Sequence, residues 1–148
     1  MNKRIAVFPG SFDPFTIGHM ALLKRTIDLF DRVVVAIGIN TQKKCFWSPE
    51  DRLAAIKQAT KNMGNVDVVT YSGLTTDLCR DLGAKYIVRG VRNTTDFDYE
   101  RTVADNNRLI APDIETLLLL AEPKYAAISS SLVRELAAFG KDYSNFIV

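Results

Sequence analysis

Short aliphatic and β-branched runs recur along the chain, and each is followed by a longer segment of mixed polarity. The runs cover residues 5–8, 33–37, 66–69, 86–88 and 116–120, and each has the length of one buried strand. Continuous apolar runs of this kind are typical of parallel strands that are covered on both faces. The pattern therefore predicts five parallel strands.

The segments between these runs carry apolar residues at helical spacing. Ser48 and Pro49 indicate the start of one helix, Gly83 indicates the end of another, and a polar helix is expected from about 95 to 107. The alternation predicts an α/β fold: a Rossmann-like, doubly wound five-stranded parallel sheet with helices on both faces, formed by residues 1–148 as a single domain. The helical stripes are Met20, Leu23, Ile27 and Phe30; Leu53, Ile56, Thr60 and Met63; Leu74, Leu78 and Leu82; and Leu132, Leu136 and Phe139.

Length, charge and cysteine content favour a single globular domain and argue against several other classes of protein. The chain has 148 residues, of which 47% are hydrophobic, so one domain can bury a core. Nineteen Lys and Arg against 17 Asp and Glu leave no basic surface for nucleic acid, which argues against a nucleic-acid or structural adaptor. Cys45 and Cys79 fit no metal or disulfide motif, and no apolar stretch spans a bilayer. We expect a cytoplasmic protein with free thiols and no membrane partner.

Candidate chemistry begins in the loop after the first strand. Ligands of parallel α/β sheets bind outside the carboxyl ends of the strands, so residues that directly follow a strand are the candidates for a site. Residues 9–19 form a Gly- and Pro-containing loop that enters a helix, where backbone N–H groups can face an anion. Ser11 adds a hydroxyl, and His19 is the only histidine in the chain. His19 is also compatible with capping or packing the first helical turn, and that alternative stays open.

Cationic and hydroxyl groups follow three further strands. Lys43 and Lys44 follow the second, where they suit an anion or simply solvent. Arg89 and Arg92 follow the fourth and suit bidentate phosphate contacts, although pairing with Asp96 and Asp98 is an equal alternative. A run of three serines, 129–131, follows the fifth; simple helix capping needs only one of them. Together these groups predict a site for a polyphosphate and a second phosphorylated molecule.

Several motifs carry a resemblance to a known family. Residues 10–14 and 16–19 (GSFDP and TIGH) resemble the nucleotidyltransferases with a T/H-x-G-H signature, and residues 128–131 (ISSS) resemble their second signature. Residues 86–92 followed by 96–100, with Lys43 placed before them, are similar to bacterial phosphopantetheine adenylyltransferases. The likeness extends from Arg4 to about Phe146.

The resemblance implies a reaction and its participants. The 4′-phosphate of 4′-phosphopantetheine would attack the α-phosphorus of ATP, giving pyrophosphate and dephospho-coenzyme A in the penultimate step of coenzyme A biosynthesis. No covalent enzyme intermediate is implied, so positioning and charge stabilisation would carry catalysis. Mg²⁺ would be bound mainly through the ATP phosphates. A cytoplasmic homohexamer is also implied.

The resemblance also implies roles for individual residues. It implies that the catalytic set is His19, Lys43, Ser11 and Arg92, and it implies no protein metal ligand. ATP would be bound by Gly10, Ser11, Phe12, His19, Arg92, Glu100, Tyr125, Ile128, Ser129, Ser130 and Ser131. The acceptor substrate would be bound by Ser11, Lys43, Leu74, Thr75, Arg89 and Asn107.

Departures from the family pattern leave alternatives. Gly73 stands where an acidic residue is common, Cys45 where a proline is common, and Ser11 where threonine is common. A related transferase could use nicotinate mononucleotide or glycerol phosphate as acceptor, although Lys43 with residues 89–92 favours phosphopantetheine. A nucleotide-binding module without catalysis is a second alternative; such a degenerate member should lose His19 or Lys43 first, and both are present.

Overall fold

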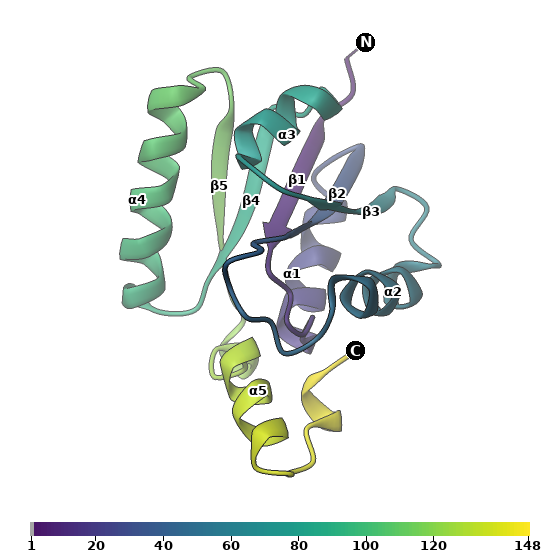
Figure 1. Ribbon diagram of the computed structural model, residues 1–148. Coiled ribbons are helices and arrows are strands. Elements are labelled where there is room, and N and C mark those ends of the chain that lie inside the picture. The colour runs from purple at the N-terminus through teal and green to yellow at the C-terminus, as the bar shows by residue number, and fades with distance from the viewer. Residues whose placement is uncertain (1) are drawn as a thin grey trace.

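The computed structural model describes residues 2–148, so Met1, where the expected domain begins, lies outside the described residues. Five strands alternate with five α-helices and two short 3₁₀ helices follow late in the chain (Figure 1). The strands are β1 (Ile5–Gly10), β2 (Arg32–Gly38), β3 (Val66–Tyr71), β4 (Tyr86–Val91) and β5 (Glu115–Leu120). The helices are α1 (Ile17–Ile27), α2 (Pro49–Thr60), α3 (Thr75–Leu82), α4 (Thr94–Ile110), α5 (Ser130–Ala138), η1 (Pro123–Tyr125) and η2 (Ser144–Phe146).

All five strands are parallel and lie in the order β3-β2-β1-β4-β5, which confirms the predicted doubly wound sheet. Successive residues of β1 pack on opposite faces, as strand geometry requires. Phe8 joins Leu23 of α1 and Ile56 of α2 in one apolar cluster, whereas Val7 joins Cys79 of α3 in a second cluster. Helices therefore cover both faces, with α3 on the near side of the sheet and α1 behind it in Figure 1.

Local sequence signals set several helix ends as expected. The Ser48 hydroxyl accepts a hydrogen bond from the Asp51 amide at 3.1 Å, with Pro49 in the first turn of α2. Gly83 ends α3 in the left-handed region with φ of 68°, where a side chain would be strained. Asn93 caps α4 by accepting from the Asp96 amide at 2.9 Å, a cap that composition alone did not single out.

The strand order places a crevice between β1 and β4. The chain leaves β1 for β2 on one side and later continues from β4 to β5 on the other, so β1 and β4 flank the point where the winding reverses. Ligands of open parallel sheets bind at such a point, outside the carboxyl ends. The arrowheads of β1 and β4 point toward α5, which lies beyond that edge (Figure 1).

The helices and the two cysteines bear on two smaller expectations. Within residues 2–148, none of the helices combines the length and apolar character that crossing a membrane requires. Cys45 is half-buried, Cys79 is buried, and both are free thiols, as the sequence predicted.

Candidate active site

A cavity of about 280 Å³ opens at the carboxyl ends of β1 and β4. The loop after β1, the start of α1, the end of β4, α4 and the start of α5 all contribute to its wall. Segments far apart in the sequence therefore meet at the edge of the sheet where the anion site was predicted. The predicted site residues that line the cavity are Gly10, Ser11, Phe12, His19, Arg89, Arg92, Glu100, Tyr125, Ile128, Ser129, Ser130 and Ser131.

Four predicted site residues do not line this cavity: Lys43, Leu74, Thr75 and Asn107. Lys43 is exposed on the loop between β2 and α2. Leu74 is 56% exposed at the start of α3, where Thr75 contacts the Tyr71 hydroxyl at 2.8 Å. Asn107 lies two turns beyond the cavity along α4 and is half-buried. All four were assigned to the acceptor substrate, and none to ATP alone.

His19 both caps α1 and lines the cavity, so the two alternatives left open by the sequence coexist. The Thr16 amide donates to His19 Nδ1 at 2.9 Å, and the His19 amide donates to the Thr16 hydroxyl at 3.3 Å. This reciprocal capping box fixes the ring against the first turn of α1. Because Nδ1 accepts a hydrogen bond, the proton of the neutral imidazole is on Nε2.

The surroundings of His19 keep its imidazole neutral. Its ring is perpendicular to that of Phe12 at 5.1 Å between centroids and is stacked on Phe15 at 5.4 Å. Burial, together with the charges of Arg89 and Arg92, lowers the pKa of His19 from 6.5 to about 3. A neutral ring with its proton on Nε2 can donate a hydrogen bond to an anion without itself giving up a proton.

Arg89 is held by a two-point ion pair with Glu100. Arg89 Nε lies 2.8 Å from Glu100 Oε2, and Nη2 lies 2.6 Å from Oε1. Arg89 Nη1 donates to the Pro9 carbonyl oxygen, which ties β4 to β1. Glu100 is 6% exposed, and both of its carboxylate oxygens bond Arg89. This contact was not among the alternatives weighed from the sequence, which considered Asp96 and Asp98.

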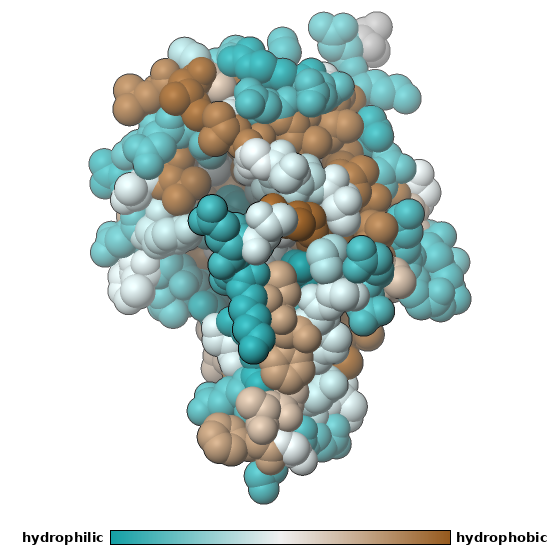
Figure 2. Space-filling view, in the orientation of Figure 1, coloured by the Kyte–Doolittle hydropathy of each residue, from teal (hydrophilic) through white to brown (hydrophobic). Residues whose placement is uncertain are grey.

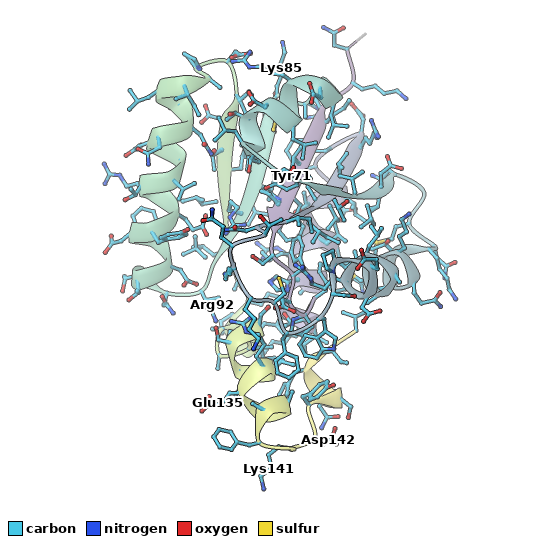
Figure 3. The ribbon with its side chains drawn as sticks, in the orientation of Figure 1. Tyr71, Lys85, Arg92, Glu135, Lys141 and Asp142 are labelled. Carbon is cyan, nitrogen blue, oxygen red and sulfur yellow. The ribbon has the colours of Figure 1, made fainter. Side chains whose placement is uncertain are left out.

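Arg92 pairs with Asp96, as one sequence alternative held. Arg92 Nε lies 2.9 Å from Asp96 Oδ2, and the Arg92 amide donates to the same oxygen at 3.1 Å. The Arg92 side chain remains 33% exposed, and Figure 3 shows it between the start of α4 and α5. A phosphate entering the cavity can therefore still reach Arg92. Asp98 forms neither of the two pairs.

The three serines have three different contacts. The Ser129 hydroxyl accepts from the Leu132 amide at 3.1 Å and caps α5. The Ser130 hydroxyl donates to the Pro14 carbonyl at 2.8 Å, and the Ser131 hydroxyl accepts from Arg134 at 3.0 Å. The first amides of a helix have no partner within the helix. The amides of Ser130 and Ser131, more than their hydroxyls, are therefore suited to bind phosphate oxygens.

Sequence reasoning did not assign Arg134, Asp13 or Arg52 to the site. Arg134 and Asp13 line the cavity, and Arg134 donates to the Asp13 carbonyl at 2.9 Å. Arg52 is buried and donates to the carbonyl of Ser11 in the cavity wall. Helical spacing offered a signal for Arg134, because it lies one turn after Ser131 on α5. Asp13 belongs to the GSFDP motif, but that motif does not reveal its contacts with the Phe46 and Trp47 amides. Arg52 offered no signal, because its contact with Ser11 comes from another segment.

Gly90, between Arg89 and Val91 in β4, has a packing role. A Cβ atom at Gly90 would lie 2.2 Å from Cδ1 of Leu22, so the glycine makes room for α1 to pack on β4. No unusual backbone conformation is recorded at this position.

A parallel sheet of this order, a T-x-G-H helix start and paired arginines around a helix N-terminus define a nucleotidyltransferase. The model of the cytidylyltransferase-like family matches residues 7–136. Phosphopantetheine adenylyltransferase of Flavobacterium psychrophilum is 49% identical over 141 residues, covering 95% of this chain and 93% of its own. The enzyme of that name from Lacticaseibacillus casei is 47% identical, covering 99% and 89%. The chain thus belongs to the cytidylyltransferase-like family and, within it, to the phosphopantetheine adenylyltransferases.

Solved structures support the fold of the chain independently. A structure from Vibrio parahaemolyticus matches with a TM-score of 0.71 at 21% identity, covering 99% of this chain and 94% of that one. The bifunctional NMN adenylyltransferase/ADP ribose pyrophosphatase from Francisella tularensis matches with a TM-score of 0.72 at 16% identity, covering 99% of this chain and 45% of that one. At these identities the similarity concerns the fold alone.

Proposed function

We propose that the protein transfers the adenylyl group of ATP to the 4′-phosphate of phosphopantetheine, forming dephospho-coenzyme A and pyrophosphate. The observation that carries this proposal is the meeting of His19, Arg89, Arg92 and the N-terminus of α5 in one cavity. Neutral hydrogen-bond donors and fixed cations are the groups that stabilise phosphate charge in a transition state. The family to which the chain belongs supports the choice of both substrates.

In the proposed reaction, the residues that line the cavity bind ATP and stabilise the charge on its phosphates. An oxygen of the 4′-phosphate forms a bond to the α-phosphorus while the bond from that phosphorus to the β-phosphate oxygen breaks and pyrophosphate leaves. His19 Nε2 donates a hydrogen bond to an α-phosphate oxygen, where charge increases. Arg92 and the amides of Ser130 and Ser131 hold the β- and γ-phosphates. Gly10, Phe12, Tyr125 and Ile128 frame the adenine, and Glu100 holds Arg89 against the nucleotide.

The acceptor side extends beyond the cavity. Ser11 and Lys43 orient the attacking 4′-phosphate, and Arg89 also contacts phosphopantetheine. Leu74, Thr75 and Asn107 flank the pantetheine arm. The cavity has a volume of only about 280 Å³, so the extended pantetheine arm must reach beyond it. The exposed side chain of Leu74 offers an apolar surface for that arm.

Magnesium is proposed as a cofactor that arrives with ATP. Among residues 2–148 no three His, Cys, Asp or Glu side chains are grouped to hold a metal ion. The carboxylates that line the cavity are already engaged: Asp96 and Glu100 pair with Arg92 and Arg89, and Asp13 accepts from two backbone amides. Phosphate oxygens are then the available hard ligands, and the ion would neutralise part of their charge.

The cellular setting is proposed from the resemblance and the surface. We place the enzyme in the cytoplasm as a homohexamer. Apolar side chains of α4 and β5 support self-association, because Tyr99, Leu109 and Leu120 are 66%, 82% and 71% exposed.

The proposed function is tested by measuring pyrophosphate release from ATP and Mg²⁺ with different acceptors. Phosphopantetheine, nicotinate mononucleotide and glycerol phosphate are compared at equal concentration. We expect release with phosphopantetheine and at most trace release with the other two. Faster transfer to either alternative acceptor would overturn the assignment of the substrate, and ATP binding without transfer to any would favour a non-catalytic module.

Replacing Lys43 tests the acceptor side of the proposal. We expect Lys43→Ala to lower kcat by about 10-fold or more, because the attacking phosphate loses a cation that orients it. Lys44→Ala is the matched control, since it removes the neighbouring exposed lysine from the same loop. Equal rates for Lys43→Ala and the parent enzyme would remove Lys43 from the catalytic set.

A further inference from the structure

Arg52 is a buried cation whose observed partners are all neutral. It lies on the first turns of α2 and is 3% exposed. Its Nη1 donates to the Ser11 carbonyl at 2.7 Å, Nε to the Trp47 carbonyl at 3.1 Å, and Nη2 to Cys45 Sγ at 3.3 Å. One guanidinium therefore joins the loop after β1 to the loop after β2.

The charge of Arg52 is not matched by a carboxylate. None of the ion pairs found among residues 2–148 includes Arg52. Burying a cation without a counterion is unfavourable unless its hydrogen bonds are satisfied. An apolar side chain would fill this position of α2 with less penalty, so packing alone does not account for an arginine. What an apolar side chain could not supply at this position is the set of three hydrogen bonds to the two loops.

Asp13 also connects the loop after β1 to the loop after β2. Its Oδ2 accepts from the Phe46 amide at 2.8 Å and its Oδ1 from the Trp47 amide at 2.9 Å. Both carboxylate oxygens are thus committed to consecutive amides of the loop after β2. The carbonyl of Asp13 accepts from Arg134, which fixes Asp13 against α5.

These contacts are the main attachments of the loop that carries Lys43. Residues 40–47 contain no helix or strand, and residues 40–44 are exposed or half-exposed. The Lys43 amide donates to the Asn40 carbonyl at 3.1 Å, and Cys45 Sγ donates to the Lys43 carbonyl at 3.7 Å. Because Cys45 also accepts from Arg52, the backbone of Lys43 is connected to Arg52 through one residue.

We propose that Asp13 and Arg52 form a clamp that sets the position of Lys43 relative to Ser11. Both are positioning residues: they touch the loops and not the reacting atoms. The inference rests on the proposed function, because it concerns the same acceptor phosphate. Misplacement of a reacting group by about 1 Å can cost about 100-fold in rate, so a loop held at three points is worth more than a loose one.

The first test is kinetic and uses Arg52→Lys, which keeps the charge but cannot span three acceptors. We expect kcat to fall about 10-fold or more while KM for ATP stays within about twofold. In a Lys43→Ala background the same substitution should change kcat less than about twofold, because the positioned group is already absent. Equal losses in both backgrounds, or full activity of Arg52→Lys, would overturn the clamp.

The second test needs no activity. Trp47 is the only tryptophan of the chain, so its fluorescence reports the clamped loop. We expect acrylamide to quench Trp47 more strongly in Arg52→Lys and in the milder Asp13→Asn, with circular dichroism unchanged. Lys57→Gln, an exposed position of the same helix, is the control and should match the parent.

The two tests separate the clamp from the proposed function. If the parent enzyme transfers nothing to phosphopantetheine, the proposed function fails, yet quenching of Trp47 still decides whether the loops are tied. If Arg52→Lys does not fold, Asp13→Asn carries both measurements. Unchanged quenching in a folded clamp variant would overturn the inference.

Discussion

At the scale of single residues, His19 shows how the fold changes the chemistry of a side chain. The imidazole has an ordinary pKa near 6.5, which would leave it partly charged in a cell. Enclosure between two phenylalanines and proximity to two arginines lower that pKa to about 3. The residue is thereby restricted to one tautomer and one charge state, which suits a hydrogen-bond donor better than an acid–base catalyst.

Neutral His19 has a consequence for the pH dependence of stability. Between about pH 6.5 and 3 the unfolded chain binds a proton at this residue that the folded chain does not, so stability falls as pH falls through this window. As the only histidine, His19 gives a single imidazole signal in proton NMR. We expect that signal not to titrate between pH 8 and about pH 5. A midpoint near 6.5 would contradict the neutral, half-buried imidazole.

Replacing His19 tests its part in transfer. We expect His19→Ala to lower turnover by about 10²–10³, the usual loss when one transition-state donor is removed, while ATP binding remains. His19→Gln keeps an N–H donor and should recover part of the rate. Isothermal titration with ATP and pyrophosphate release provide the two readouts. Turnover of His19→Ala within a few-fold of the parent would exclude the role proposed for it.

Sequence reasoning found the groups of the site but not most of their partners. His19 lies in the first turn of α1 after β1, Arg89 lies near the carboxyl end of β4, and Arg92 directly follows β4, positions that motif and topology reveal. The partner of Arg89 is Glu100 on α4, 11 positions later in the sequence, and Arg52 contacts Ser11 across 41 positions of sequence. Such pairings depend on how helices dock on the sheet, and no local pattern encodes them.

At the scale of elements, the ion pair of Arg89 and Glu100 joins β4 to α4. Removing the carboxylate leaves a largely enclosed guanidinium without its counterion. We expect Glu100→Gln to lower the free energy of unfolding by about 1–3 kcal/mol. Asp105→Asn on the same helix breaks the open pair with Arg101, whose side chains are 69% and 67% exposed, and should cost about 0.5 kcal/mol or less. Urea denaturation of both variants measures the difference, and equal losses would contradict it.

Strands were easier to predict than the buried faces of helices. Each apolar run became a strand with at most three residues added at an end, because burial on both faces leaves a continuous pattern. The stripe of Leu132, Leu136 and Phe139 was misleading: Val133 is the buried residue of α5, and Phe139 is 75% exposed. α5 packs beyond the edge of the sheet, where a short helix contacts loops and its apolar face is not set by one periodic stripe.

At the scale of the whole molecule, exposed apolar side chains of α4 and β5 are the candidate contact between copies of the chain. Figure 2 shows hydrophobic atoms gathered near the end of α4 at the upper left of the view. Tyr99, Leu109 and Leu120 are 66%, 82% and 71% exposed, an arrangement more typical of an interface than of a solvated face. Exposed apolar groups of this size favour association, whereas the number six comes from the family resemblance.

Assembly is tested by changing that surface alone. We expect sedimentation of the parent protein to give a mass near six times the 16.5 kDa chain. The double substitution Tyr99→Glu and Leu109→Glu should shift it to smaller species, because charges at an apolar contact lose their hydration without gaining partners. Phe139→Glu is the matched control, since Phe139 is 75% exposed on α5, away from α4 and β5, and should leave the mass unchanged. A monomeric parent at micromolar concentration, or a hexamer unaffected by both glutamates, would exclude this surface as the contact. The candidate cavity is lined by residues of one chain, so a smaller species that retains transfer would separate assembly from catalysis.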